Sequence, residues 1–355
     1  RHRGTPAPSP SAHMWIWVLG IGFGGFGGRG GGAAAEMHAI KRFGWGELSQ
    51  MEIYRYMVRK EPIILTDLLP EAKIESTNIE FFLDICGKEK AHEGITNHIL
   101  SAVLSLSDEE REQLGQRIEM MFGVKLDRYM EMLRGDYTVE SIHRHMKNFD
   151  NTHNKFEYLA DYALPLTLHD WPIAQCTPFM KHITARPLPL LDMFQRHWDQ
   201  YVKEDGEDDN LYEAGVVFHA TKGTRAYPLH RHEFDNQSIM MVFQGSKRFA
   251  IFNRSEEIYL YPTQKKIETE FELTDRGDHV FEAEIFFRDY DKHPLLEKAS
   301  GFEGVVGKGE IIVIPCESIH LIHNEEENLA VAWHGPCITD EFVDTISAES
   351  NTCDM

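Results

Sequence analysis

Two histidines one residue apart form the pattern in this sequence that could most directly do chemistry. His230 and His232 lie in the segment LHRHEFDN, residues 229–236. In a β-strand, residues i and i+2 point to the same face, so these two imidazoles would project into one space. The spacing therefore predicts that they share a metal ion. The alternative interpretation is two polar residues on a half-exposed strand.

A third histidine follows a buried strand farther along the chain. In EIIVIPCESIH the apolar run ends at Pro315, and a Pro-x4-His spacing leads to His320. A proline turn at a strand end would bring His320 in from a neighbouring strand. Three imidazoles at the mouth of a barrel would bind a metal ion and leave positions open for water and substrate, as catalytic metal sites do.

Short strands separated by turns would position these histidines. The C-terminal half has apolar or alternating runs between glycines, prolines and acids, among them LYEAGVVFHATKG, SIMMVFQGSKRFAIF, EGVVGKGEIIVIP and NLAVAWHG. Such punctuation is typical of strands and turns. We expect a mainly β fold of about eight strands, a double-stranded β-helix (jelly-roll or cupin) core whose cavity opens at one end. An N-terminal helical layer would make the whole α+β.

The N-terminal half predicts this helical layer. Apolar residues at helical spacing predict helices within residues 46–60 and 79–87, and EPIILTDLL between them reads as a short buried strand. Residues 100–149 fit further helices, and one of these carries His143 and His145. Because side chains two apart on a helix diverge, these two histidines would not share a metal, and we expect them to be structural.

Composition divides the chain into four regions. These are a low-complexity leader in residues 1–36, an N-terminal helical region in 37–210, a β core in 211–340, and a flexible C-terminal tail in 341–355.

The leader supports two interpretations. An apolar run from Met14, followed by the small residues Ala33, Ala34 and Ala35, predicts a secretory signal with a cleavage site. A disordered glycine-rich leader is the alternative, because no basic segment separates Met14 from the run. The first predicts the secretory pathway or the endoplasmic reticulum lumen, and the second the cytoplasm or nucleus. Since the run is too short and glycine-rich for a bilayer, we expect no membrane span in the mature chain.

Charge and cysteine content argue against other classes of protein. The chain has 57 acids against 36 lysines and arginines, a net charge of -21, whereas nucleic-acid binding needs many cations. We therefore expect no direct nucleic-acid partner. The five cysteines show no CxxC pair and no zinc-type spacing, so no disulfide framework is predicted. Cys316 is expected to act as a small buried apolar residue.

The order of four motifs resembles a known enzyme family. KGTRAYPLHRH, FQGSKRFAIF, GKGEIIVIPCESIHLIHN and NLAVAWHG occur in this order. This arrangement is similar to the JmjC-domain, or cupin-8-like, branch of the Fe(II)- and 2-oxoglutarate-dependent oxygenases. With EPIILTDLL and YLADYALPL upstream, the resemblance spans roughly residues 45–336. It implies iron(II) bound by a His-x-acid pair and a distal histidine, with 2-oxoglutarate chelating the metal.

The resemblance also implies roles for individual residues. His230 matches the first metal ligand and His320 the distal one. Lys247 matches the lysine that neutralises the far carboxylate of 2-oxoglutarate, and an ammonium is suited to that role. Tyr227 could donate to the same carboxylate, and Asn236 could form a hydrogen bond near the metal.

His232 departs from the family pattern, because it stands in the carboxylate position. Three explanations compete. The site could be a three-histidine cupin site that still binds metal, or it could have lost turnover and serve in binding. The register could also be shifted to start at His232, which puts Phe234 in the carboxylate position and requires Glu233 or Asp235 to reach in. We prefer His230, His232 and His320 as ligands.

These observations predict an enzyme of the JmjC-like type. We expect hydroxylation of a protein side chain in preference to demethylation, since no histone-reading module is recognisable. The acidic composition predicts a protein or peptide partner with a basic segment. One alternative is a non-catalytic cupin-fold binding protein that has lost the carboxylate ligand. Another is a three-histidine cupin dioxygenase that acts on a small molecule without 2-oxoglutarate.

Overall fold

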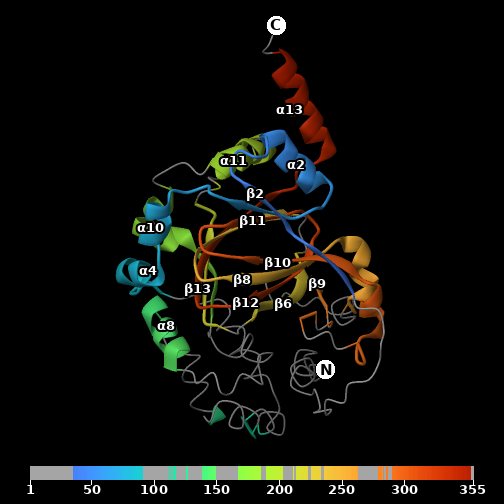
Figure 1. Ribbon diagram of the computed structural model, residues 1–355. Helices are drawn as coiled ribbons and strands as arrows, with labels where there is room; N and C mark the ends of the chain where they lie inside the picture. Colours follow the sequence, from blue (N-terminus) through green and yellow to red (C-terminus); the bar gives the residue numbers. More distant parts are fainter. Residues whose placement is uncertain are drawn as a thin grey trace, which may run out of the picture.

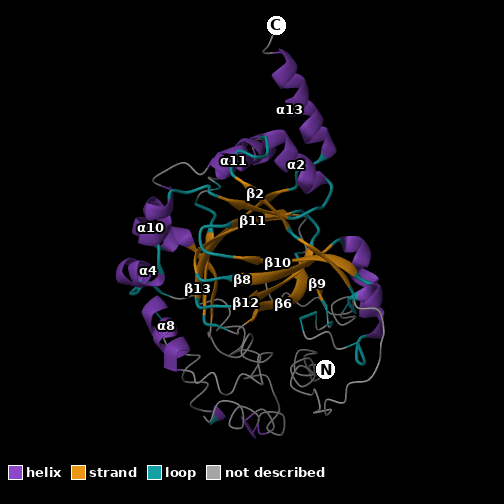
Figure 2. Ribbon diagram, viewed as in Figure 1, coloured by secondary structure: helices purple, strands orange, loops and turns teal. Residues whose placement is uncertain are grey.

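Two β-sheets form the centre of the molecule, and helices pack around them (Figure 1). Figure 2 shows that the helices lie at the periphery of the strands. The computed structural model describes residues 35–90, 138–148, 167–184, 189–202, 211–222, 225–232, 236–262 and 279–352. Short gaps lie within these ranges at 212, 282, 284 and 287–289, and a few isolated residues between 112 and 126 are also described.

The first sheet has six strands and carries the histidines predicted as ligands. Its order is β1 (Glu36–Ala39), β10 (Ser300–Val306), β8 (Lys247–Phe252), β12 (Ile319–Asn324), β6 (Arg225–Arg231) and β9 (His279–Val280). Strand β1 pairs with β10 in parallel, and the other described pairs in this sheet are antiparallel.

The second sheet has seven strands. Its order is β2 (Lys41–Gly44), β3 (Ile63–Thr66), β11 (Ile311–Ile314), β7 (Asn236–Gln244), β13 (Asn328–Pro336), β5 (Val216–Ala220) and β4 (Thr167–Pro172). Only β2 and β3 pair in parallel among the described strands of this sheet. The predicted mainly β, jelly-roll-like core with helices is therefore confirmed.

Alternating side chains on the strands fill the space between the sheets. In β7, Met240 and Val242 belong to a cluster that includes residues of both sheets, whereas Met241 and Phe243 belong to a cluster on the outer face. Successive side chains of a strand point to opposite faces, and here both faces of the second sheet are covered. The strand is therefore apolar at consecutive positions. The inner cluster also contains Phe249 of β8, so it joins the two sheets.

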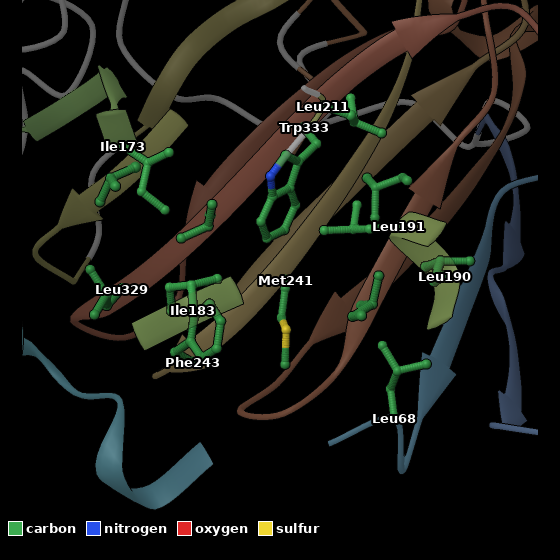
Figure 3. Packing of buried hydrophobic residues seen from close by; sticks show 14 of the residues in the cluster. Leu68, Ile173, Ile183, Leu190, Leu191, Leu211, Met241, Phe243, Leu329 and Trp333 are labelled. Atoms are coloured by element: carbon green, nitrogen blue, oxygen red, sulfur yellow. The ribbon is translucent and has the colours of Figure 1, made fainter. Parts of the chain in front are cut away.

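Helices cover the outer face of the second sheet. Trp333 and Met241 of this sheet belong to the same apolar cluster as Leu191, and Figure 3 shows part of this cluster. The described helices are α2 (Gln50–Val58), α3 (Glu71–Ser76), α4 (Ile79–Cys86), α8 (Val139–Asn148), α10 (Thr177–Thr184), α11 (Pro189–Val202) and α13 (Asp340–Thr352). Among the described residues, no helix is both long and apolar enough to cross a bilayer.

Two predicted helices begin at clear cap residues. Ser49 and Glu52 form a capping box at α2, in which each side chain bonds the backbone N–H of the other residue. Asn78 caps α4 by accepting a hydrogen bond from the Phe81 N–H at 2.9 Å. Both helices and the strand β3 between them agree with the sequence prediction. Most of residues 100–149 lies outside the described residues.

Two elements differ from the expected organisation of the chain. The N-terminal region contributes strands β1 to β4 to both sheets, so it is part of the β core as well as its helical cover. Residues 340–352 form helix α13 where a flexible tail was predicted. The physical reason is that Phe342 packs edge-on against Tyr54 of α2, with ring centroids 5.5 Å apart.

The prediction of no disulfide framework is wrong. Cys86 bonds Cys176, and Cys316 bonds Cys337. The first bond joins the end of α4 to the residue before α10, two helices that pack together. The Cα atoms lie 5.7 Å apart although the cysteines are 90 residues apart in the sequence, so local spacing does not reveal the pair. Cys316 is buried, as expected, but it is bonded.

The two disulfides predict the number of reactive thiols. Four of the five cysteines are paired with one another, and the fifth, Cys353, lies outside the described residues. Alkylation of the denatured, unreduced chain should therefore modify one cysteine, and alkylation after reduction should modify all five. Mass spectrometry of the intact chain measures both. Five modified cysteines without reduction would contradict the pairing.

Candidate metal centre

The pairing of β6 with β12 brings two of the predicted ligands together. His230 lies directly opposite His320 in the antiparallel register, and their ring centroids are 4.3 Å apart. His232 follows the end of β6, with its ring 5.1 Å from that of His230 and 5.2 Å from that of His320. One ligand nitrogen from each of the three lies within 4.8 Å of the others. The three histidines form one cluster, as the spacing predicted.

A bulge in β6 precedes the cluster. Ile322 pairs with Tyr227 and His320 with His230, so β6 has one more residue than β12 between these two pairs. Pro228 lies in the extra stretch and has no N–H for the ladder, which is a common cause of a bulge. Beyond the bulge, His230 pairs with His320.

Hydrogen bonds fix the orientation of two of the imidazoles. His232 Nδ1 donates to Asn236 Oδ1 at 3.0 Å, and His320 Nδ1 donates to the Ser318 carbonyl at 3.2 Å. A neutral ring that donates from Nδ1 carries its lone pair on Nε2. Metal-binding histidines usually have such a partner on the other nitrogen, because it fixes the tautomer and the ring orientation. Asn236 thus orients the ring of a predicted ligand from the start of β7.

A polar pocket opens beside the cluster. His232 and His320 line it together with Asn236, Ser238 and Glu317, and with Arg231, Ile314, Pro315 and Ser318. The histidines themselves are little exposed: His230 and His320 are 6% and 7% accessible. The cluster therefore borders a pocket, while two of its three imidazoles are largely shielded from solvent.

Glu317 does not supply the carboxylate that His232 replaces. Its Oε1 accepts a hydrogen bond from Arg254 at 2.8 Å, and its Oε2 lies 3.4 Å from Lys60 Nζ. The Arg254 hydrogen bond and the Lys60 charge lower the pKa of Glu317, which stabilises the anion in this ion pair. Both of its oxygens are therefore engaged by basic side chains, and Glu317 is not part of the group of close ligand atoms that the histidines form.

A fourth histidine near the cluster was not predicted. His334 of β13 lies with its ring centroid 5.3 Å from that of His232, and its Nδ1 is 2.8 Å from Ser238 Oγ. Its segment, NLAVAWHG, reads as a strand, and nothing in the spacing connects it to His232. The register of β13 with β7 makes the connection, because His334 pairs with Ser238.

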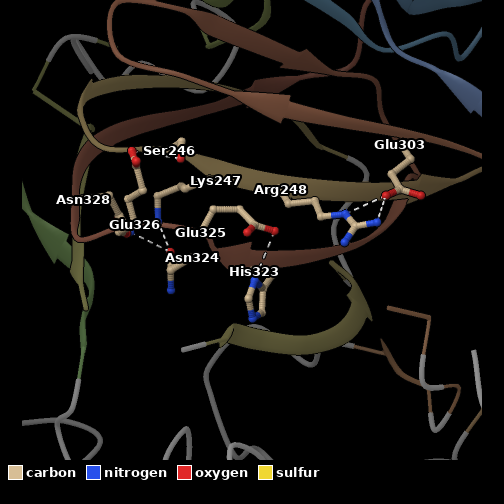
Figure 4. Close-up of polar contacts among 9 residues, drawn as sticks. All are labelled: Ser246, Lys247, Arg248, Glu303, His323, Asn324, Glu325, Glu326 and Asn328. Atoms are coloured by element: carbon tan, nitrogen blue, oxygen red, sulfur yellow. Dashed lines mark hydrogen bonds and ion pairs between the residues drawn. The ribbon is translucent and has the colours of Figure 1, made fainter. Parts of the chain in front are cut away.

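Lys247 is buried on the face of the first sheet that carries His320. It pairs with Asn324 and has no accessible surface, and its Nζ donates to Asn324 Oδ1 at 2.8 Å (Figure 4). Asn324 and His320 are four residues apart in β12, about 13 Å along a strand. Burial lowers the pKa of Lys247 to about 7.

Some predicted positions lie outside the described residues. These are Glu233, Phe234 and Asp235, so the shifted register stays open. Tyr227 belongs to β6 by its backbone, and its side chain also lies outside what is described.

A disulfide holds the loop that leads to His320. Cys316 follows Pro315 at the end of β11, and its partner Cys337 follows β13. Ser318 Oγ donates to the Pro315 carbonyl at 2.7 Å within the same turn. The bond and the turn together fix the position from which β12 begins.

The comparisons with known proteins give one distant similarity to report. No protein-family model matches the chain. The arginine-specific demethylase JMJ20 of Arabidopsis thaliana is 21% identical over 292 residues, which cover 82% of this chain and 54% of that protein. The chain thus spans about half the length of this relative.

The orientation of His232 yields a first prediction for the site. Replacing Asn236 by alanine removes the acceptor for His232 Nδ1 and should weaken iron(II) binding about 10- to 100-fold, the usual loss for an outer-shell partner. Anaerobic calorimetric titration measures this affinity. Asn253→Ala, in a loop after β8, is the matched control and should bind like the wild type. Equal affinities in both variants would show that Asn236 does not support a ligand.

Lys247 yields a prediction for the pH dependence of stability. Its pKa is depressed in the folded chain, from 10.5 to about 7, so the unfolded chain binds more protons between these values. The contribution of Lys247 to the free energy of unfolding therefore rises with pH above about 7, by at most about 1.4 kcal/mol per pH unit. Lys247→Met removes the titration. The free energy of unfolding of wild type minus variant should increase from pH 7 to 9, and a constant difference would contradict the burial of a titrating ammonium.

Proposed function

We propose that the chain is a JmjC-type oxygenase that uses iron(II) and 2-oxoglutarate to hydroxylate a side chain of a protein. The observation that carries the proposal is the cluster of His230, His232 and His320 on the sheet that also buries Lys247. The distant similarity to an enzyme named as an arginine-specific demethylase supports the same family.

The residues of the cluster fit a divalent metal ion. Three imidazoles can each offer one nitrogen, and those of His232 and His320 have their Nδ1 atoms already bonded to oxygen acceptors. Three ligands on one side leave the other positions for a chelating cosubstrate and oxygen. When bound there, iron(II) and 2-oxoglutarate supply the oxidative chemistry of this enzyme class.

Lys247 fits the recognition of an anionic cosubstrate. An ammonium in a dry interior attracts a carboxylate more strongly than an exposed one, and binding of the anion favours the charged lysine. Asn324 holds Nζ in place by accepting its hydrogen bond. Because burial brings the pKa of Lys247 to about 7, cosubstrate affinity is expected to fall as the pH rises above this value.

The neutral His232 changes the charge at the centre. A two-histidine, one-carboxylate set leaves a divalent ion with one net positive charge, whereas three neutral imidazoles leave two. The additional charge strengthens the attraction for a dianionic cosubstrate. It also changes the redox potential of the bound metal and the preference of the site among metal ions, relative to a two-histidine, one-carboxylate set.

A protein substrate with a basic segment agrees with the charge of the chain. The net charge of -21 repels acidic partners and steers basic ones. The name of the relative also specifies a basic amino acid.

The two disulfides favour the secretory alternative for the location of the chain. Disulfides form and persist in oxidising compartments and are rare in the cytosol and nucleus. We infer that the chain folds in the endoplasmic reticulum or a compartment beyond it, which agrees with the signal predicted from Met14.

A cupin dioxygenase that works without 2-oxoglutarate is the second candidate. The presence of His232 in the carboxylate position favours this candidate, because a cupin dioxygenase of this kind binds its metal with histidines alone. In that enzyme Lys247 would only fill the interior, so its replacement would leave turnover of the small-molecule substrate unchanged.

Succinate formation distinguishes the two candidates. Iron-loaded wild type should convert labelled 2-oxoglutarate to succinate, and His320→Ala should not. Lys247→Met should raise the half-saturating 2-oxoglutarate concentration roughly 10- to 100-fold, since a hydrogen bond to a charged group contributes about 1.5–3 kcal/mol. Lys308→Met, on the surface, is the matched control. Metal binding without any succinate would contradict the proposal and favour the second candidate.

A further inference from the structure

A second group of metal-binding side chains lies away from the centre described above. His143 of α8, His219 of β5 and Glu327 of the turn between β12 and β13 each offer a ligand atom within 4.8 Å of the others. His143 Nδ1 lies 2.8 Å from His219 Nε2, and the two rings are stacked with centroids 5.1 Å apart. These residues come from three elements that are remote in the sequence.

The hydrogen bonds of His219 point its lone pair into this group. Its Nδ1 is 2.9 Å from the carbonyl oxygen of Asn328, which only accepts, so Nδ1 carries the proton. In the neutral ring Nε2 then has the lone pair, and Nε2 faces His143 Nδ1. An imidazole that donates to a backbone carbonyl from one nitrogen and presents the other is the usual arrangement of a metal ligand. His219 is 1% exposed, so its orientation is fixed by packing.

Glu327 adds a carboxylate oxygen that lacks a partner. Its Oε1 is buried and has no hydrogen-bond partner among the described residues, whereas Oε2 forms an ion pair with Lys147 at 2.6 Å. A buried, unpaired carboxylate oxygen is costly. A cation bound at Oε1 would satisfy it, and Lys147 would remain as the outer partner of the same carboxylate.

The turn that carries Glu327 is held firmly in place. Its carbonyl lies 2.1 Å from the point where a Cβ on Gly245 would be, so only glycine, here at φ +71°, permits the approach of the two turns. Asn328 Nδ2 donates to Asn324 Oδ1 and to the Glu326 carbonyl, at 3.0 and 2.9 Å (Figure 4). The side chain of Glu327 is therefore attached to a backbone that its neighbours hold in place.

We propose that His143, His219 and Glu327 form a binding site for Zn²⁺ that fastens α8 to the second sheet. Two imidazoles and one carboxylate are a common zinc set, with water as the fourth ligand of a tetrahedron. Zinc would replace the hydrogen bond between the two rings, and the proton of His143 would move to its Nε2. His143 shares this metal with residues of other elements and not with His145 of its own helix. This proposal does not depend on the function proposed for the first centre.

The test uses the full chain with the first centre removed. His230→Ala/His320→Ala protein, freed of metal with a chelator and then dialysed against Zn²⁺, should retain one zinc per chain by elemental mass spectrometry. Adding His143→Ala or Glu327→Gln removes a ligand and should lower the affinity by more than the about 10- to 100-fold that loss of an outer-shell partner costs. His38→Ala and Glu325→Gln are the matched controls and should retain the zinc. Circular dichroism verifies that each variant is folded.

A second measurement needs no variant. Anomalous scattering from crystals of zinc-loaded wild type should show zinc about 2.0–2.1 Å from His219 Nε2. The proposal is overturned if the double variant binds no zinc, if His143→Ala and Glu327→Gln bind it as the controls do, or if the crystals show zinc only elsewhere.

Discussion

The antiparallel pairing of β6 with β12 is the constraint on which the candidate metal centre depends. It sets His230 opposite His320, and a slip by one residue would turn one of them to the opposite face. The register is maintained by the apolar cluster between the sheets, in which Phe249 of β8 and Ile322 of β12 pack with residues of the second sheet. The disulfide at Cys316 holds the entrance to β12. The apolar core thus fixes the positions of the predicted metal ligands.

Polar groups around the histidines give the centre its particular character. Asn236 and the Ser318 carbonyl orient two rings that would otherwise have several rotamers and tautomers. Glu317 forms an ion pair with Arg254. No carboxylate of the described pocket lining therefore occupies the ligand position in which His232 stands. A metal ion bound by the three histidines would therefore carry more positive charge than one in a two-histidine, one-carboxylate set, and the buried Lys247 on the same sheet would suit the anionic cosubstrate proposed above.

The sequence predicted the β core, the helices α2 and α4 and the meeting of the three histidines, because period-two alternation, cap residues and the His-x-His spacing are local signals. The remaining features depend on contacts between distant elements. Cys86 meets Cys176 only because α4 packs on α10. His334 approaches His232 through the pairing of β13 with β7, and His143 reaches His219 by the packing of α8. No spacing along the chain encodes such meetings.

X-ray absorption spectroscopy of the iron(II)-loaded protein tests the central claim most directly, because scattering from imidazole rings counts the histidines on the metal. His143→Ala serves as the background in every sample, so that iron binds only at the first centre. The account predicts three imidazoles in this background and two when His232→Ala is added. The same count in both proteins would contradict it, since His232 would then not be a ligand and the carboxylate position would be filled by another group.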